Sequence, residues 1–124
     1  MNNSAAIGVF DSGVGGLTVV AELMRRLPSE DMIYFGDTAR VPYGTKSPET
    51  VLRFARENLD FLKSRQVKMI VVACNTASSV ALPRLVEEEE LPLAGVLLPG
   101  ARAAAAATRN GRVAVIGTSA TIRS

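Results

Sequence analysis

Residues 67–77 read VKMIVVACNTA, and this stretch decides the fold class. Its segment 69–73 is apolar throughout, as expected of a central strand in a parallel sheet that helices cover on both faces. Small polar residues, Cys74, Asn75 and Thr76, follow at once and end the strand. The stretch therefore predicts a βα unit with a polar turn at the carboxyl end of its strand.

The same alternation continues on both sides of this unit. It predicts an α/β fold with a parallel sheet of βα units flanked by helices. Short apolar runs mark the expected strands, which are residues 7–10, 32–35, 67–73, 93–97 and 113–116. Apolar residues at spacings of three and four mark the expected helices, which are residues 16–27, 48–66 and 100–108, with a further helical segment interrupted at Pro83.

Two of the expected helices have a clear apolar face. In residues 16–27 this face consists of Leu17, Val20, Met24 and Leu27. In residues 48–66 it consists of Leu52, Ala55, Leu59 and Leu62. The second helix has a strong start, because Ser47 offers a hydroxyl cap and Pro48 fits the first helical position. The loop before it, residues 36–48, is long for this fold, and loops of that length are usually functional or disordered.

Composition limits the chain to one globular core and excludes several functions. Hydrophobic residues make up 48% of the 124 residues, which is too many for a disordered chain. The net charge of +2 and the absence of tryptophan argue against binding of nucleic acid. No apolar stretch approaches the length of a membrane span, and residues 1–6 lack the pattern of a secretory signal. We therefore expect a cytoplasmic protein that binds neither nucleic acid nor membranes.

The chain has one cysteine, Cys74, and no histidine. A single cysteine excludes an internal disulfide, and without histidine the usual zinc spacings are absent, so we expect no metal site. No Ser-His or Cys-His pair can form within the chain. Proton transfer near neutral pH must then use thiol, carboxylate, lysine or tyrosine groups.

Small polar residues follow most of the expected strands. In open α/β sheets, ligands bind outside the carboxyl ends of the strands, so these residues form a candidate pocket for a small zwitterion. They are Asp11, Ser12 and Gly13, then Gly36, Asp37 and Thr38, then Cys74, Asn75 and Thr76, then Pro99 and Gly100, and finally Gly117, Thr118 and Ser119. The alternative is that they cap helices, as residues of βα loops often do. We favour the cap for Thr118 or Ser119, and ligand contact for the first and third groups.

Residues 11–16, DSGVGG, invite comparison with the glycine loops that bind nucleotides. The dinucleotide fingerprint would need glycine where Thr18 stands, and the ending of a phosphate loop is missing. Asp11 would also repel a phosphate. A helix amino-terminus can instead hold a carboxylate, while Asp11 takes an ammonium group.

Cys74 stands between an apolar strand and the expected start of a helix. The N–H groups and dipole at a helix amino-terminus stabilise a thiolate, which can then exchange protons near neutral pH. Asn75 and Thr76 offer neutral hydrogen bonds beside it. A buried structural cysteine is the alternative, and position alone does not decide between the two.

Three blocks resemble the bacterial glutamate racemases of the aspartate/glutamate racemase superfamily, in order and with fitting spacing. They are GVFDSGVGGLTV at residues 8–19, YFGDTARVPYG at residues 34–44 and VACNTA at residues 72–77. Residues 99–101 and 117–118 also resemble later blocks of that family, so the resemblance extends to the end of the chain. The Asp-Ser-Gly-x-Gly-Gly opening favours glutamate over aspartate as the substrate.

The resemblance implies a two-lobed enzyme that needs no cofactor and has its active site between pseudo-symmetric α/β lobes. Two cysteines would face opposite sides of the substrate Cα, one as a thiolate base and the other as an acid. Motif matching makes Cys74 the first of these cysteines, with Asp11 assisting it. The implied substrate contacts are Asp11, Ser12, Tyr43, Gly44, Asn75, Thr76 and Thr118.

The chain departs from that family because it lacks the second cysteine with its Cys-Thr-His motif, and it is much shorter. We therefore expect an amino-terminal portion, in which residues 1–98 form the first lobe with Cys74 and residues 99–124 begin a truncated second lobe. The implied function is interconversion of L- and D-glutamate, which supplies D-glutamate for peptidoglycan. The chain alone would be inactive, unless a homodimer brought two Cys74 residues to one pocket.

Two alternatives remain open at this point. The chain could be a non-catalytic module that binds an acidic amino acid or a partner protein. It could also belong to a racemase or isomerase of a related acid such as aspartate. Proton exchange at the substrate Cα and its dependence on Cys74 distinguish these possibilities.

Overall fold

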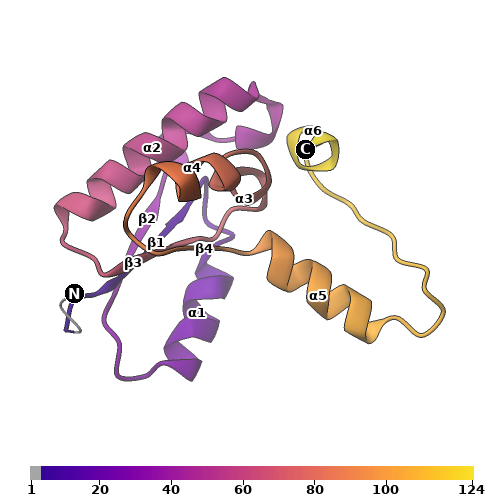
Figure 1. Ribbon diagram of the computed structural model, residues 1–124, viewed down its shortest axis with the longest axis horizontal. Helices are drawn as coiled ribbons and strands as arrows, with labels where there is room; N and C mark the ends of the chain where they lie inside the picture. Colours follow the sequence, from indigo (N-terminus) through magenta and orange to yellow (C-terminus); the bar gives the residue numbers. More distant parts are fainter. Residues whose placement is uncertain (1–3) are drawn as a thin grey trace.

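The computed structural model describes residues 4–124 and has the parallel α/β architecture that the sequence predicts (Figure 1). Four strands form one sheet in the order β2-β1-β3-β4, and every neighbouring pair is parallel. The strands are β1 (Ile7–Asp11), β2 (Met32–Gly36), β3 (Met69–Val72) and β4 (Leu93–Gly95). All of β1 and most of β3 are buried, which confirms the prediction that the apolar stretch near residue 70 is a central strand.

Helices cover both faces of the sheet (Figure 1). The helix α1 (Leu17–Arg26) lies on one face. The other face is covered by α2 (Pro48–Ser64), α3 (Asn75–Val80) and α4 (Leu82–Glu88). The remaining elements are the 3-10 turns η1 (Thr38–Arg40) and η2 (Tyr43–Thr45) and the helices α5 (Leu97–Ala107) and α6 (Ser119–Arg123). Within residues 4–124, no helix combines the length and the apolar character that crossing a lipid bilayer requires.

The helix α2 follows its predicted start and inner face closely. The Ser47 hydroxyl accepts a hydrogen bond from the Thr50 N–H at 3.2 Å, so the predicted cap is present. Ala55, Leu59 and Leu62 are fully buried against the sheet. A long amphipathic helix with a good cap is the kind of element that local sequence specifies well.

The helix α1 packs with a different face from the one predicted. Of the predicted inner residues, only Val20 packs against the sheet, together with Val19 and Leu23. The other three predicted inner residues are exposed instead, with exposed fractions between 41% and 58%. They are Leu17, Met24 and Leu27. The predicted and the observed apolar faces both recur at helical spacing, so periodicity alone could not show which one is buried. Packing against the sheet determines the buried face.

The end of β4 and the start of α5 also differ from the prediction, because the strand stops at Gly95 and the helix begins at Leu97. The Ser78 hydroxyl accepts a hydrogen bond from the Val96 N–H at 3.2 Å, at the point where the strand would continue. Pro99 fits inside α5 because it lies in the first turn. Backbone N–H groups of the first turn have no acceptor within the helix, so proline, which has no N–H, loses no hydrogen bond there.

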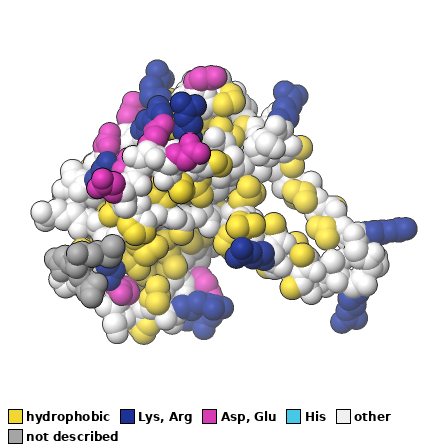
Figure 2. Space-filling model, viewed as in Figure 1, with side chains coloured by type: hydrophobic (Ala, Val, Ile, Leu, Met, Phe, Trp, Pro, Cys, Tyr) yellow, Lys and Arg dark blue, Asp and Glu magenta, His cyan; other side chains and the backbone are white. Residues whose placement is uncertain are grey.

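The predicted fifth strand at residues 113–116 is wrong. This segment belongs to a part of the chain, residues 97–118, that projects from the sheet and that we call the arm (Figure 1). Its residues 112–118 are not in a strand, and Val115 and Ile116 are 71% and 97% exposed. Figure 2 shows hydrophobic side chains distributed along the arm. A strand requires a neighbour for its hydrogen bonds, and none of the four strands pairs with this segment.

The buried Ser78 hydroxyl generates a first prediction, because it donates to the Val72 carbonyl at 3.0 Å as well as accepting from Val96. The change Ser78→Ala should lower the free energy of unfolding by about 1–3 kcal/mol, since two backbone groups lose their partner. Ser79→Ala is the matched control, because that hydroxyl donates to the Thr76 carbonyl of its own helix at 3.1 Å and joins no second element. The control should change stability by less than about 0.5 kcal/mol. Urea unfolding measures both, and equal losses would contradict the assignment.

Candidate active site

Asp11 and Cys74 lie at the same edge of the sheet. The strand β1 ends at Asp11, and the Ala73 N–H donates to the Phe10 carbonyl at 2.9 Å just beyond the end of β3. This bond comes directly before Cys74, the residue that precedes α3. The predicted groups at these two strand ends are therefore neighbours in space, as parallel pairing requires.

The Asp11 carboxylate holds the glycine loop, residues 11–16. It accepts hydrogen bonds from the Ser12 N–H at 2.8 Å and from the Gly16 N–H at 2.6 Å. A Cβ atom at position 16 would lie 2.8 Å from the Asp11 Cβ, so the close approach requires glycine there. The Tyr34 hydroxyl supports the same loop by donating to the Gly13 carbonyl at 2.9 Å.

Cys74 is the amino-terminal cap of α3. Its sulfur accepts a hydrogen bond from the Ala77 N–H at 3.4 Å and lies 3.4 Å from the Ser12 hydroxyl oxygen. The residue is only 5% exposed. Its sulfur is held by these two contacts, one with the start of α3 and one with the glycine loop. The position at a helix start, which the sequence predicted, is confirmed.

A depression with a volume of about 410 Å³ opens beside the thiol. The predicted site residues that line it are Asp11, Ser12, Cys74, Asn75, Thr76 and Thr118. Thr118 also caps α6, because its hydroxyl accepts from the Thr121 N–H at 3.4 Å, so the predicted cap is confirmed and the predicted ligand contact stays a prediction. Gly13, Gly15 and Gly16 of the glycine loop also line it, whereas the sequence did not predict the further lining residues Thr18, Val19, Ala73 and Val96.

Tyr43 and Gly44 do not line this depression. The Tyr43 side chain is 1% exposed, and its hydroxyl donates to the Asp37 carboxylate and accepts from the Asn58 amide at 2.8 Å. Its side chain therefore belongs to the core rather than to the lining that the resemblance implied. Gly44 instead lies against Thr118, where a Cβ atom would be only 2.3 Å from the Thr118 Cβ.

A polar network that sequence reasoning missed holds the loop before α2. The Arg40 guanidinium donates to Asp37 at 2.8 Å, contacts Glu57 and lies 4.0 Å from the Phe54 ring centre. Asn58, on the buried face of α2, donates to the Tyr43 hydroxyl. A polar residue among apolar positions of a buried helix face requires a partner, and that signal at Asn58 could have indicated the network.

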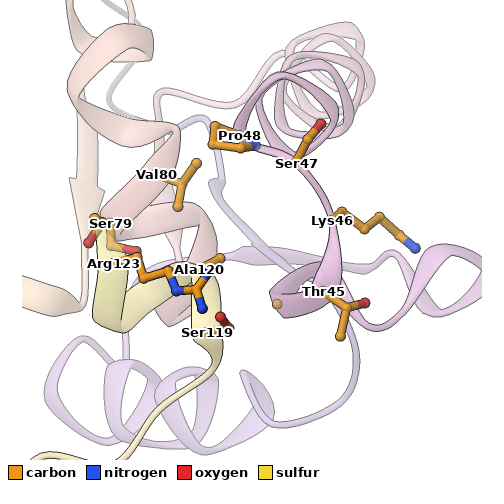
Figure 3. A pocket seen from close by; sticks show the side chains of 11 residues that line it. Thr45, Lys46, Ser47, Pro48, Ser79, Val80, Ser119, Ala120 and Arg123 are labelled. Carbon is orange, nitrogen blue, oxygen red and sulfur yellow. The ribbon is translucent and has the colours of Figure 1, made fainter.

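A second cavity, of about 500 Å³, lies next to Gly44 and α6 and is shown in Figure 3. There Val80 lies toward Pro48 at the start of α2, and the Arg123 side chain lies beside Ala120 of α6. Cys74 is not among its lining residues, so we assign the candidate chemistry to the depression instead. Among the described residues, no cluster of three or more cysteine, aspartate or glutamate side chains is arranged to hold a metal ion.

The sequence profile of the Asp/Glu/Hydantoin racemase family matches residues 7–124, and the chain belongs to this family. A glutamate racemase of Geobacter metallireducens is 65% identical over 119 residues, which are 96% of this chain and 44% of that protein. The chain therefore spans less than half the length of this curated relative.

Solved structures agree with this assignment. The glutamate racemase of Thermus thermophilus in complex with β-chloro-D-alanine superposes with a TM-score of 0.90 at 57% identity, covering 99% of this chain and 47% of that one. The glutamate racemase of Francisella tularensis in complex with D-glutamate superposes with a TM-score of 0.86 at 46% identity, covering 98% and 46%. The fold is thus that of an amino-terminal portion of such racemases.

The contact between Gly16 and Asp11 generates a second prediction. Gly16→Ala should lower the free energy of unfolding by about 1–3 kcal/mol, because the new methyl group overlaps the Asp11 side chain. Gly15→Ala is the control, since among residues 4–124 no atom beyond the chain neighbours of Gly15 would lie within 4 Å of a Cβ atom there, and it should cost less than about 0.5 kcal/mol. Chemical unfolding measures both variants. A tolerated Gly16→Ala would show that Asp11 does not hold the loop as described.

The two tyrosines generate a prediction about alkaline pH. Burial raises the pKa of Tyr34, and the nearby charge of Asp11 raises it further. Burial, followed by the hydrogen bond to Asp37, raises the pKa of Tyr43. The unfolded chain loses these protons near pH 10, while the folded chain keeps them, so stability should fall as the pH rises above about 10.

Tyr43→Phe should make this decline shallower, because one of the two groups no longer titrates. Unfolding free energies between about pH 9 and 11 measure the effect, and tyrosinate absorbance follows ionisation in the folded chain. Both tyrosines ionising in the folded chain at their ordinary pKa would contradict the prediction.

Proposed function

We propose that the chain carries one side of a glutamate racemase active site, in which the Cys74 thiolate exchanges the α-proton of glutamate. The supporting observation is the position of the sulfur, which lies 3.4 Å from the Ser12 hydroxyl and lines the same depression as Asp11. A thiol fixed at the end of a central strand, beside a cavity and a carboxylate, suits proton transfer to a small zwitterion. The relatives' name, glutamate racemase, supports the choice of substrate.

Charge supports one orientation of the substrate in the depression. Asp11 would attract the ammonium group of an amino acid. The Thr76 and Thr118 hydroxyls are neutral and would donate hydrogen bonds to a carboxylate, which the charge of Asp11 would repel. Asn75, exposed at the first turn of α3, offers a further amide donor. Tyr43 and Gly44 would influence substrate binding indirectly, because the backbone at Gly44 lies against Thr118. The Tyr43 side chain is bonded to Asn58 in the core and would not contact the substrate.

The proposed step is a proton exchange that needs no cofactor. The thiolate takes the proton from Cα, leaving a thiol and a carbanion whose electron pair is delocalised into the α-carboxylate. Return of a proton from the same thiol restores the original isomer. Inversion needs an acid on the opposite face, and the 124-residue chain has one thiol and no histidine. A second acid would come from a second lobe, as in a longer chain, or from another copy of this chain in a homodimer.

The division into lobes remains part of the proposal. Residues 1–98 would form the first lobe with Cys74, and residues 99–124 would begin the second. Two observations support this boundary: the sheet is complete at Gly95, and the arm projects from it before α6 returns to Thr76. In the complete enzyme, D-glutamate would be supplied for peptidoglycan in the cytoplasm.

The test is to incubate the chain with L-glutamate in deuterated buffer. We expect deuterium at Cα with retention of configuration, and no D-glutamate, because a single thiol can return a proton only to the face from which it came. Cys74→Ser should slow the exchange by at least about 100-fold, the usual contribution of a positioned acid or base. Ser79→Ala is the control and should leave exchange unchanged. Proton NMR of Cα measures exchange, and chiral chromatography measures inversion.

The other outcomes select other functions. Glutamate binding that is unaffected by Cys74→Ala, without any exchange, would indicate a binding module. Faster exchange of aspartate than of glutamate would indicate a racemase of a related acid. Inversion that depends on Cys74 and on protein concentration would indicate a homodimer with two thiols at one site.

A further inference from the structure

The arm contains a segment, residues 113–116, that has the sequence of a strand but no strand beside it. The segment reads VAVI, so a strand formed by it would be apolar on both sides, as in a parallel sheet that is covered on both faces. Val113, Val115 and Ile116 are exposed. Within residues 4–124, no strand pairs with the segment, and no hydrogen bond joins its backbone to another backbone group. Its apolar side chains and its backbone groups are therefore both available to a partner.

The sheet has an open edge at β4. This strand is the last in the order β2-β1-β3-β4, and in the described part of the chain no strand lies beyond it. Its three residues are only half-buried. The N–H and C=O groups along the outer side of an edge strand can pair with a strand from another chain. The chain thus carries both an open parallel edge and an unpaired segment that is suited to such an edge.

The charges beside the edge and on the arm are opposite. Residues 87–90, which lead into β4, are four glutamates. Two of them form ion pairs with α2, whereas Glu87 and Glu90 are exposed and form no ion pair within residues 4–124. The arm has three basic residues and no acidic residue, and the basic residues are Arg102, Arg109 and Arg112. Charge complementarity therefore favours contact between an arm and the glutamates beside β4.

Within one copy, the segment is held away from β4. Thr118 follows the segment and lies against Gly44, where a Cβ atom would be 2.3 Å from the Thr118 Cβ. The Thr121 hydroxyl oxygen of α6 lies 3.3 Å from that of Thr76. The chain between the end of α5 and α6 accordingly runs apart from the sheet (Figure 1). The open edge of one copy and the unpaired segment of another can then pair with each other.

We propose that two copies of this chain form a dimer in which residues 113–116 of each copy add a parallel strand to β4 of the other. The direction follows from charge, because only a parallel strand places Arg112 at the same end of β4 as Glu90. An antiparallel strand would place Arg112 at the opposite end, beyond Gly95. The exchange is reciprocal, so the same two surfaces meet twice about a two-fold axis. The pairing does not involve Cys74, and the inference is independent of the proposed function.

The first test measures the mass of the 124-residue chain by sedimentation velocity. We expect a change from the mass of one chain to that of two as the concentration rises. Arg112→Glu should weaken dimerisation by at least about 10-fold, because repulsion replaces attraction at both symmetric contacts. Glu90→Arg should act in the same way, and the two changes together should restore dimerisation to within about threefold of the original chain. Arg102→Glu, at an exposed arginine of α5, is the matched control and should have no effect.

The second test identifies the surface by hydrogen exchange. The backbone amides of residues 113–116 should become protected as the concentration rises. Replacing Ala114 and Val115 together by proline removes two adjacent N–H groups, one of which must point toward β4 in any strand, and should abolish the dimer.

The single-chain mass at every concentration would overturn the inference, and so would failure of the double charge reversal to restore the dimer. A dimer that survives both prolines would show that another surface is used. Protection that does not depend on concentration would show that the segment pairs with β4 of its own copy. Each of these results would leave the proposed function untouched.

Discussion

The parallel pairing of β1 with β3 is the constraint on which the candidate site depends. The register places Phe10 opposite Val72, and the two strands end together. Beyond that point the chain after β1 turns into the glycine loop at Asp11, and the chain after β3 turns into α3 at Cys74. Because parallel strands have their carboxyl ends at one edge, a carboxylate and a thiol that are far apart in the sequence line one depression. A shift of one residue in register would turn one of them to the opposite face.

The polar groups at this edge serve the fold as well as the candidate chemistry. The Asp11 carboxylate holds the glycine loop, the Cys74 sulfur caps α3, and the Thr118 hydroxyl caps α6. Among the described residues, no buried side-chain nitrogen or oxygen lacks a hydrogen-bond partner. Side chains that are already fixed by backbone hydrogen bonds lose little conformational freedom when a ligand binds, which is the basis of a preorganised site. The same arrangement means that each substitution at this edge affects stability as well as binding.

The arm stands apart from this well-packed region. Its helix α5 has no buried residue, and Ile116 is 97% exposed, whereas α6 beyond it contacts α3 through the Thr121 and Thr76 hydroxyls. The arm is thus connected to the sheet at β4 and returns to the site at α6. The glutamate racemase of Geobacter metallireducens is more than twice as long as its segment that matches this chain.

Local sequence alone determined much of this protein. The apolar strand near residue 70, the Ser47 cap and the buried face of α2 are patterns within a few residues, and each was predicted correctly. Of the five polar groups expected after strands, those at Asp11 and at Cys74 line the depression, whereas those at Gly36 and at Pro99 do not. The family blocks also named Cys74 and Asp11, which the fold brings to one depression.

Tertiary structure decided the rest, because it depends on contacts between distant residues. The sheet selected Val19 and Leu23 for the inner face of α1, and the lack of a neighbouring strand left residues 113–116 unpaired. The direction of the Tyr43 side chain was set by Asp37 and by Asn58 of α2, and the contact between the Thr76 and Thr121 hydroxyls joins α3 to α6. Periodicity and capping act between near neighbours and can be read from the sequence. Which side chains meet across the fold is fixed only when the elements pack.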